Sequence, residues 1–192
     1  MTEAKLDFSR YFWQSENVRL RPFCLEDAEV RFMASLDSPT RQAHNDGIEL
    51  PTSVELQREW LEKVAGCQDN GRIVLFVIEN LAGEMAGWIS LHSRNQKNGT
   101  FSFGVAVYRA YRGQGYAVEA ARMLLKYGFW EQRYQKCNSI CTHTNAASMR
   151  MHAKLGFVEE GRGRRNNFFN GQYHDDVYWG MTREEFDALM PA

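Results

Sequence analysis

The sequence has no large excess of charge, no long apolar run and no Cys-x-x-Cys pair. Its 192 residues include 23 Lys and Arg against 24 Asp and Glu, so no excess of positive charge favours nucleic acid or an anionic membrane as a partner. The longest apolar runs, such as residues 73–78, are far too short to span a bilayer. We therefore expect neither a nucleic-acid-binding protein nor a membrane protein, and any binding of a polyanion must be local.

The four cysteines give no sign of a disulfide framework. Cys137 and Cys141 lie on one expected strand, where four residues span roughly 13 Å, whereas a disulfide requires Cα atoms within about 7 Å. The first ten residues contain neither an apolar core nor a cleavage site for export. The expectation is a reduced, cytoplasmic protein without a metal site, in which the cysteines are buried as small apolar side chains.

Apolar periodicity and turn residues predict a chain of mixed α/β (α+β) class, with no internal repeat and no linker. The expected strands are residues 17–23, 72–79, 85–93, 99–107 and 137–144, followed by a hairpin that turns at Asn170–Gly171. The expected helices are residues 25–36, residues 52–64 with a capping box from Thr52 and Glu55, one beginning at Gly115, one from a cap at Asn145 to Gly156, and one capped by Thr182 and Glu185. Residues 38–51 are rich in helix breakers and are predicted to form a loop. The order indicates an antiparallel meander that feeds a strand–helix–strand crossover.

A short segment rich in arginine and glycine lies between an expected strand and an expected helix. It consists of Arg112, Gly113, Gln114, Gly115, Tyr116 and Ala117. The first turn of a helix has unpaired N–H groups and a partial positive charge, and glycine lets an anion approach the backbone. A phosphate placed there would accept several backbone hydrogen bonds, and Arg112 would add charge from the side. The segment is therefore predicted to bind a polyanion.

Three phosphate-binding patterns can be compared with this segment. A P-loop requires Gly-Lys-Ser/Thr, which is absent, and Val118 stands at the third glycine of a dinucleotide fingerprint. The pattern Gln/Arg-x-x-Gly-x-Gly/Ala is matched completely by Arg112, Gly115 and Ala117. A dinucleotide-binding oxidoreductase also needs an acidic residue that ends a second strand about 20 residues on, whereas Glu131 falls near the end of a helix.

The surroundings of this loop resemble the GNAT superfamily of N-acetyltransferases, which use acetyl-coenzyme A (acetyl-CoA). The blocks YRGQGYAVEA and KLGFVEEG, the opening VRLRPFCLEDAE and the tail NGQYHDD…MTREEF are similar to the branch that holds ribosomal-protein N-terminal acetyltransferases and spermidine acetyltransferases. The likeness covers roughly residues 17–187. It implies a single GNAT-like domain over residues 1–192, with a central, mostly antiparallel sheet of about seven strands flanked by helices.

The resemblance also implies a site for acetyl-CoA as co-substrate. In this family the strand before the loop splays from its neighbour, and the backbone groups of Val105, Ala106 and Val107 would hold the pantetheine arm. The pyrophosphate would rest on the amides of residues 112–117. Asn145 and Ser148 match polar positions that hold the coenzyme further along, and Asn145 is also expected to cap a helix.

The catalytic positions of the family are matched less well. Many relatives carry a tyrosine that donates to the departing sulfur immediately before the EKLGF-type run. Here the position is His152, whose unperturbed pKa near 6.5 leaves proton transfer, coenzyme contact and simple packing all open. Ser102 stands where relatives often carry a glutamate, and a serine is a poor base. His152 and Ser102 are the catalytic candidates, and Glu84, His92 and His143 are weaker ones.

The resemblance implies direct acetyl transfer to an amine in a ternary complex, but the sequence does not name the amine. The absence of the strand glutamate favours a protein N-terminus, because an α-amine has a pKa of about 7.7–8.0 and a lysine-like amine one of about 10.4. A polyamine or an aminoglycoside is the alternative, as is a non-catalytic acyl-CoA-binding domain, and a homodimer is left open. The acceptor is expected to enter between residues 80–84, residues 38–51 and the tail hairpin, near His44, Asp46, Tyr173, Asp175 and Asp176.

Overall fold

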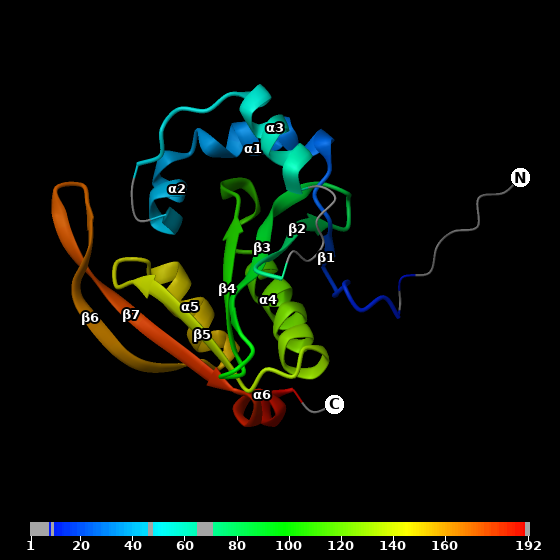
Figure 1. Ribbon diagram of the computed structural model, residues 1–192. Coiled ribbons are helices and arrows are strands. Elements are labelled where there is room, and N and C mark those ends of the chain that lie inside the picture. The colour runs from blue at the N-terminus through cyan, green and yellow to red at the C-terminus, as the bar shows by residue number, and fades with distance from the viewer. Residues whose placement is uncertain (1–7, 9, 46–47, 65–70, 191–192) are drawn as a thin grey trace, which may run out of the picture.

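The described residues form a seven-stranded sheet in the order β1-β2-β3-β4-β5-β7-β6, which Figure 1 shows. The structure is a computed structural model that describes residues 8, 10–45, 48–64 and 71–190. The strands are β1 (Val18–Arg21), β2 (Val74–Asn80), β3 (Met85–Asn95), β4 (Thr100–Val107), β5 (Lys136–Thr142), β6 (Val158–Phe169) and β7 (Gln172–Thr182). The helices are α1 (Ala28–Ser35), α2 (Ser38–Asn45), α3 (Val54–Val64), α4 (Tyr116–Lys126), α5 (Ala146–Leu155) and α6 (Arg183–Leu189), with 3-10 turns at Leu25–Asp27 and Arg109–Tyr111 and a π-helical turn at Tyr127–Glu131.

The pairing of the strands confirms the mixed, mostly antiparallel sheet predicted from the sequence. Within the described ranges, β4 and β5 are the only parallel neighbours, and every other pair of neighbouring strands is antiparallel. A parallel pair requires a crossover connection, and α4 supplies it. The predicted strand–helix–strand crossover is therefore the unit that brings β4, the arginine–glycine loop and β5 together.

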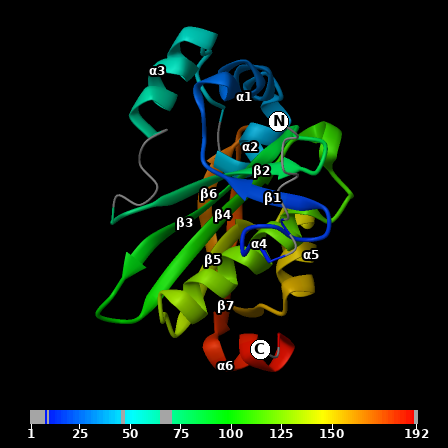
Figure 2. The ribbon, with the colours of Figure 1, turned by 90° about the vertical axis from the view of Figure 1, so that its right-hand side faces the viewer.

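Helices cover both faces of the sheet, because its strands carry apolar side chains on both sides. Successive residues of β2 illustrate this: Ile78 packs in the large cluster with α4, whereas Val77 packs with α1 and α3. The buried face of α4 consists of Val118, Ala120, Ala121, Met123, Leu124 and Leu125. In Figure 2 the helices α1, α2 and α3 gather at one end of the sheet, above α4 and α5.

Residues 38–51 depart from the prediction, because they begin with the helix α2 and are not a loop throughout. The Asp37 carbonyl accepts a hydrogen bond from the Arg41 N–H at 3.0 Å, and the Asp37 carboxylate accepts one from the Thr40 N–H at 3.4 Å. Asp37 therefore caps the helix and Pro39 stands in its first turn, where a missing N–H costs nothing. The prediction counted Pro39 as a breaker and missed this position.

Most of the predicted caps and turns are confirmed. The Asn145 side chain accepts from the Ser148 N–H, Gly156 ends α5 in a left-handed conformation, and Thr182 forms a capping box at α6. Asn170 and Gly171 have φ values of 51° and 74°, as a type I′ turn requires. At α3 the cap is Ser53, whose hydroxyl accepts from the Leu56 N–H at 3.2 Å, and not Thr52 as predicted.

Some predictions fall on residues that the structure does not describe. Cys67, Asp46 and the side chain of His44 lie outside the described residues. Within the described residues, no helix is both long enough and apolar enough to cross a membrane, and no three His, Cys, Asp or Glu side chains gather as metal ligands would.

Candidate active site

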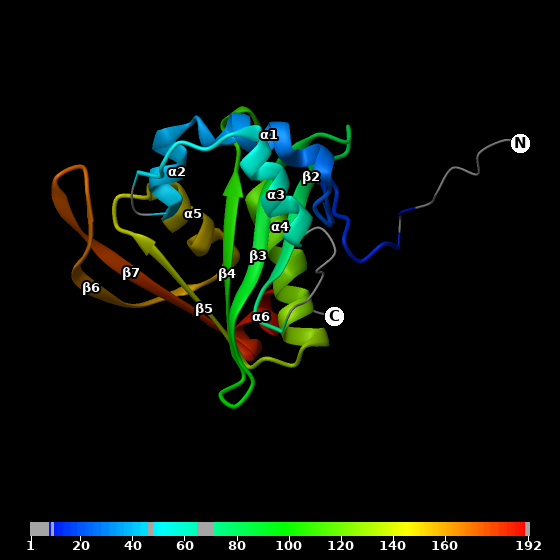
Figure 3. The same cartoon turned by 45° about the horizontal axis from the view of Figure 1, so that its top comes forward.

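The strands β4 and β5 pair over three residues and then diverge. Their register joins Thr100 to Lys136, Phe101 to Cys137 and Ser102 to Asn138, whereas both strands continue further. Figures 1 and 3 show the two strands opening as a V above this short paired base. Phe103, the first residue beyond the pairing, packs its ring against His152 and Phe157, with centroids 5.7 Å apart in both cases. These rings fill the base of the V on the side of α5.

The backbone of β4 presents alternate residues to the gap. The Gly99 carbonyl accepts from the Lys136 N–H on the β5 side, and the Tyr108 N–H donates to the Ala86 carbonyl on the β3 side. The N–H and C=O groups of successive residues in a strand point to opposite neighbours. The backbone groups of Val105 and Val107 therefore point into the gap, where no strand of the described chain pairs with them. Ala106, the third residue predicted to hold the coenzyme, pairs with Trp88 and turns its backbone groups towards β3.

The arginine–glycine loop ends β4 and opens α4 with unpaired amides. Gly113 and Gly115 have φ values of 78° and 85°, a conformation that favours glycine. The Gly115 carbonyl accepts from the N–H groups of Val118 and Glu119. Within the described chain, no hydrogen bond uses the N–H groups of residues 113–117. A Cβ atom built on Gly113 would meet nothing within 4 Å, whereas one on Gly115 would lie 3.8 Å from a Glu119 carboxylate oxygen, so the loop borders free space at Gly113.

Arg112 joins this loop to α2 across the mouth of the V. Its Nε donates to the Val107 carbonyl at 3.2 Å, and its Nη2 donates to the Thr40 hydroxyl at 2.6 Å. Two residues after Thr40 in α2, the side-chain amides of Gln42 and Asn170 bond to each other. Thr40 is not among the predicted site residues, although the Asp37-Ser38-Pro39-Thr40 start of α2 is a signal that the sequence contains.

His152 is buried in the core with both ring nitrogens occupied. Only 2% of the residue is exposed, and the ring stacks on Trp179 with a centroid distance of 5.3 Å. Its Nδ1 lies 2.8 Å from the Ser148 carbonyl and therefore carries the hydrogen, so Nε2 accepts from the Ser139 hydroxyl at 2.7 Å. Burial lowers the pKa of His152 to about 4, although the bond to the Ser148 carbonyl opposes this shift. The ring is neutral near pH 7, and its catalytic role remains a prediction.

The two catalytic candidates lie on opposite faces of β4. Phe103 points to the face of His152, so the neighbouring Ser102 points to the other face. Ser102 is directly opposite His92 on β3, at the base of the V. Burial lowers the pKa of His92, and a hydrogen bond to the backbone of Phe103 opposes the shift. The structure therefore places Ser102 with His92 and not with His152.

The remaining candidates are held by other contacts. Glu84 accepts from the Asn80 side chain at 2.7 Å, and the His143 ring is 3.1 Å from the Asp175 backbone nitrogen. The Asp175 carboxylate accepts from the Arg165 N–H at 2.8 Å. Asp176 is 7% exposed and accepts from the side chains of two asparagines on β6. The two aspartates predicted to attract a cation are thus engaged within the tail hairpin.

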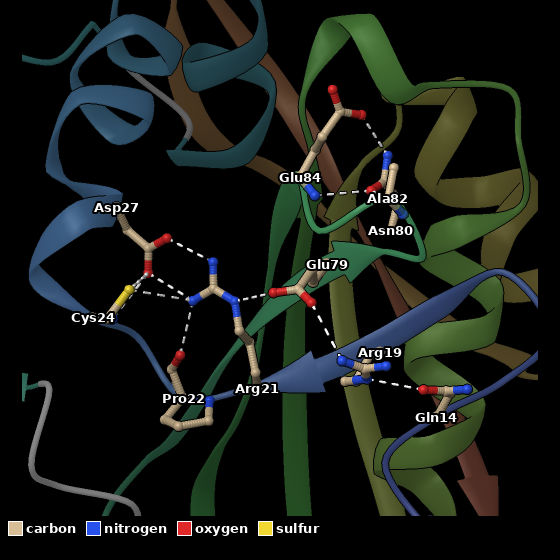
Figure 4. A network of polar contacts seen from close by, with 10 residues as sticks. All are labelled: Gln14, Arg19, Arg21, Pro22, Cys24, Asp27, Glu79, Asn80, Ala82 and Glu84. Atoms are coloured by element: carbon tan, nitrogen blue, oxygen red, sulfur yellow. Dashed lines mark hydrogen bonds and ion pairs between the residues drawn. The ribbon is translucent and has the colours of Figure 1, made fainter. Parts of the chain in front are cut away.

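Two adjoining cavities lie between α1 and the end of β4, with volumes of about 380 and 560 Å3. Both are lined by Met33, Ala34 and Tyr108. One wall of the larger cavity holds the network in Figure 4, in which Arg21 lies between Asp27 and Glu79. Burial alone would raise the pKa of Asp27, but the hydrogen bonds from Arg21 and the Cys24 N–H lower it. The charges on this wall are therefore paired with one another.

Comparisons with known proteins identify the family. The family model described as the acetyltransferase (GNAT) domain matches residues 17–158. The chain is 37% identical over 176 residues to YokL, an uncharacterised N-acetyltransferase of the SPbeta prophage of Bacillus subtilis, covering 92% of this chain and 96% of that protein. It is 31% identical over 177 residues to the spermidine N(1)-acetyltransferase of Escherichia coli K12, covering 91% and 90%. The chain therefore belongs to the GNAT acetyltransferase family.

A solved structure shows the same fold. The spermidine N-acetyltransferase of Vibrio cholerae, determined with CoA and spermine, superposes with a TM-score of 0.76 at 20% identity, over 90% of this chain and 99% of that one. The family predicted from the sequence is confirmed, and the spermidine acetyltransferases of the predicted branch are among the relatives. Membership makes the protein an acyltransferase and decides against the dinucleotide-binding oxidoreductase.

Proposed function

We propose that the protein binds acetyl-CoA along the open side of β4 and transfers its acetyl group directly to a primary amine. One observation carries the proposal: backbone groups without a strand partner and a helix turn with unpaired amides occur together at one end of β4. An amide-containing arm can take the place of the missing strand, as a peptide does when it extends a sheet edge. The diphosphate that follows can accept from the amides of the loop.

The residues present fit this coenzyme. Val105 and Val107 have no strand partner on this side, although the Val107 carbonyl accepts from Arg112, and the N–H groups of residues 113–117 follow after one 3-10 turn. The positive φ values of Gly113 and Gly115 keep side chains away from the amides. Arg112 is exposed and would exchange its bond to Thr40 for one to a phosphate oxygen.

Acetyl transfer to an amine requires few chemical groups from the protein. The amine attacks the thioester carbonyl as a neutral group, loses a proton, and the sulfur leaves as a thiol or thiolate. An N–H of the open β4 edge would polarise the carbonyl. Ser102, with His92 beside it, stands at the base of the V and would pass the proton of the amine to solvent. We assign His152 to positioning Ser139 and Ser148 beneath the gap.

For the acceptor we propose the α-amine of a peptide. Such an amine is partly neutral near pH 7, whereas each primary amine of a polyamine is almost fully protonated. Ser102 provides no strong base on β4, and the aspartates of the tail hairpin are engaged with Arg165 and with asparagines. The E. coli relative named a spermidine acetyltransferase keeps a polyamine as the competing acceptor.

A panel of acceptors tests this choice. With saturating acetyl-CoA, we expect short peptides with free N-termini to release thiol at least tenfold faster, at equal concentration near pH 7, than spermidine or an aminoglycoside. The same peptides with blocked N-termini are the matched control and should release none. Faster acetylation of spermidine than of every peptide would show that the inference from Ser102 is wrong.

A further inference from the structure

Arg31 of α1 is a half-buried cation that has no carboxylate partner. Its Nε donates to the Gln57 side chain at 3.1 Å, and its Cζ lies 4.0 Å above the ring of Trp60. Within the described chain, its two Nη atoms form no hydrogen bond and no carboxylate lies at ion-pair distance. Nearby arginines differ, because Arg21 and Arg41 each hold a carboxylate.

The surroundings of Arg31 penalise its charge without neutralising it. Burial lowers the pKa of Arg31, whereas Asp27 and Glu49 oppose the shift from a distance. These two carboxylates are already held by Arg21 and Arg41. A buried charge is ordinarily paired with an opposite charge. Arg31 has no such partner in the described chain, so its position suits the binding of an anion.

The geometry of the guanidinium suits a carboxylate. Its Cζ lies over the ring of Trp60 and its Nε is anchored by Gln57, which leaves the two Nη groups without a hydrogen-bond partner in the described chain. Arg binds carboxylates through two parallel N–H···O bonds from such a fork. Since the side chain is already held in place, little rotamer entropy is lost when an anion binds.

Arg31 lies beside the end of β4, a few residues beyond the open edge along which acetyl transfer is proposed. Tyr108 follows β4 directly, packs with the cluster of α1 and α3, and interacts electrostatically with Arg31. Val105, on the open edge, is three residues from Tyr108, or about 10 Å along an extended strand. In an extended peptide whose N-terminus reaches that edge, the second residue lies about 3.5 Å and the third about 7 Å further on, and an acidic side chain at either position adds the remaining reach.

We propose that Arg31 forms a subsite for a carboxylate carried by the acceptor, so that peptides with Asp or Glu at the second or third residue are preferred. This rests on the proposed transfer to a peptide α-amine. A polycation, the opposite choice, would meet the charge of Arg31, while Asp175 and Asp176 are engaged within the tail hairpin. Electrostatic complementarity of this kind sets specificity between acceptors.

Matched peptides test the subsite. Amidated peptides of one sequence would carry Glu, Gln or Lys at the second residue and then at the third, and kcat/KM would be measured with saturating acetyl-CoA. For at least one position we expect Glu to exceed Gln by about tenfold and Lys by more. In Arg31→Met, which keeps an aliphatic stem on Trp60, the ratio of Glu to Gln should fall below twofold. Arg31→Lys, which keeps the charge without the fork, should retain part of it.

Controls separate this subsite from the proposed function and from the coenzyme. Arg58→Gln removes an exposed charge from α3, one residue from Gln57, and should leave the preference unchanged. The KM for acetyl-CoA should be the same in Arg31→Met as in the wild type; a large rise would assign the anion to the coenzyme and overturn the subsite. Equal rates with Glu and Gln peptides, or a preference that survives in folded Arg31→Met, would overturn it too. Should no peptide be acetylated, the proposed function itself fails and the subsite with it.

Discussion

Replacing Gly115 by glutamate is expected to weaken acetyl-CoA binding by more than tenfold, which corresponds to about 1.4 kcal/mol. Gly115 caps α4 in a left-handed conformation, and the unpaired amides of residues 113–117 surround it. A carboxylate there would occupy the position proposed for the pyrophosphate and would repel its charge. Titration calorimetry with acetyl-CoA measures the loss directly.

Part of any effect of Gly115→Glu comes from the backbone, because a side chain is strained at a φ of 85°. Gly171→Glu is the matched control: Gly171 has a φ of 74° and lies at the turn between β6 and β7. It imposes similar strain away from the loop and should leave coenzyme affinity within twofold of the wild type. If Gly115→Glu folds and binds acetyl-CoA as tightly as Gly171→Glu, the pyrophosphate does not rest on these amides.

The free energy of unfolding is expected to fall much less in acid for His152→Gln than for the wild type. Because burial lowers the pKa of His152 from 6.5 to about 4, the folded protein resists protonation that the unfolded chain accepts. The stability contributed by the neutral ring is complete above pH 6.5 and is lost as the pH falls towards 4, by roughly 3 kcal/mol in total. Between pH 7 and pH 4.5, the free energy of unfolding of the wild type should therefore fall by about 2 kcal/mol more than that of the variant.

Urea unfolding of both proteins at several pH values gives this difference, in which the acid groups common to both cancel. A parallel pH dependence in the two proteins would mean that His152 is not held neutral by burial. The same variant examines the catalytic role predicted from the sequence. A fall in kcat with little change in the KM for acetyl-CoA supports a role at the reacting sulfur, whereas normal kinetics with lower stability assign His152 to packing.

Local signals account for most of the fold that could be predicted. The cap at Asn145, the left-handed Gly156 and the Asn170–Gly171 turn each depend on a few neighbouring residues, and each is found where the sequence places it. The start of α2 could have been predicted in the same way from Asp37 and Pro39. It was not, because the segment was judged by its number of helix-breaking residues and not by their positions. Interactions between residues close in sequence are therefore enough to predict these helix ends and this turn, provided that each residue is judged by its position in the element.

The candidate site depends on contacts that no local pattern contains. The divergence of β4 from β5 followed from the family resemblance, and the packing of Phe103 on His152 and Phe157 explains it only once the strands are placed. The pairing of His152 with Ser139 joins a helix to a strand and has no signal in either segment. Arg31 could not be predicted as a site residue either, because its lack of a carboxylate partner is a property of the packed structure.

The position of the coenzyme is tested most directly by amide NMR spectra of 15N-labelled protein during titration with acetyl-CoA. The account predicts the largest shifts at the N–H groups of residues 113–117, which have no partner in the described chain, and at Val105 and Val107 on the open edge of β4. Ala106, which faces β3, should shift less than either valine. Shifts confined to the cavities beside Met33 and Tyr108, with residues 113–117 unchanged, would contradict it.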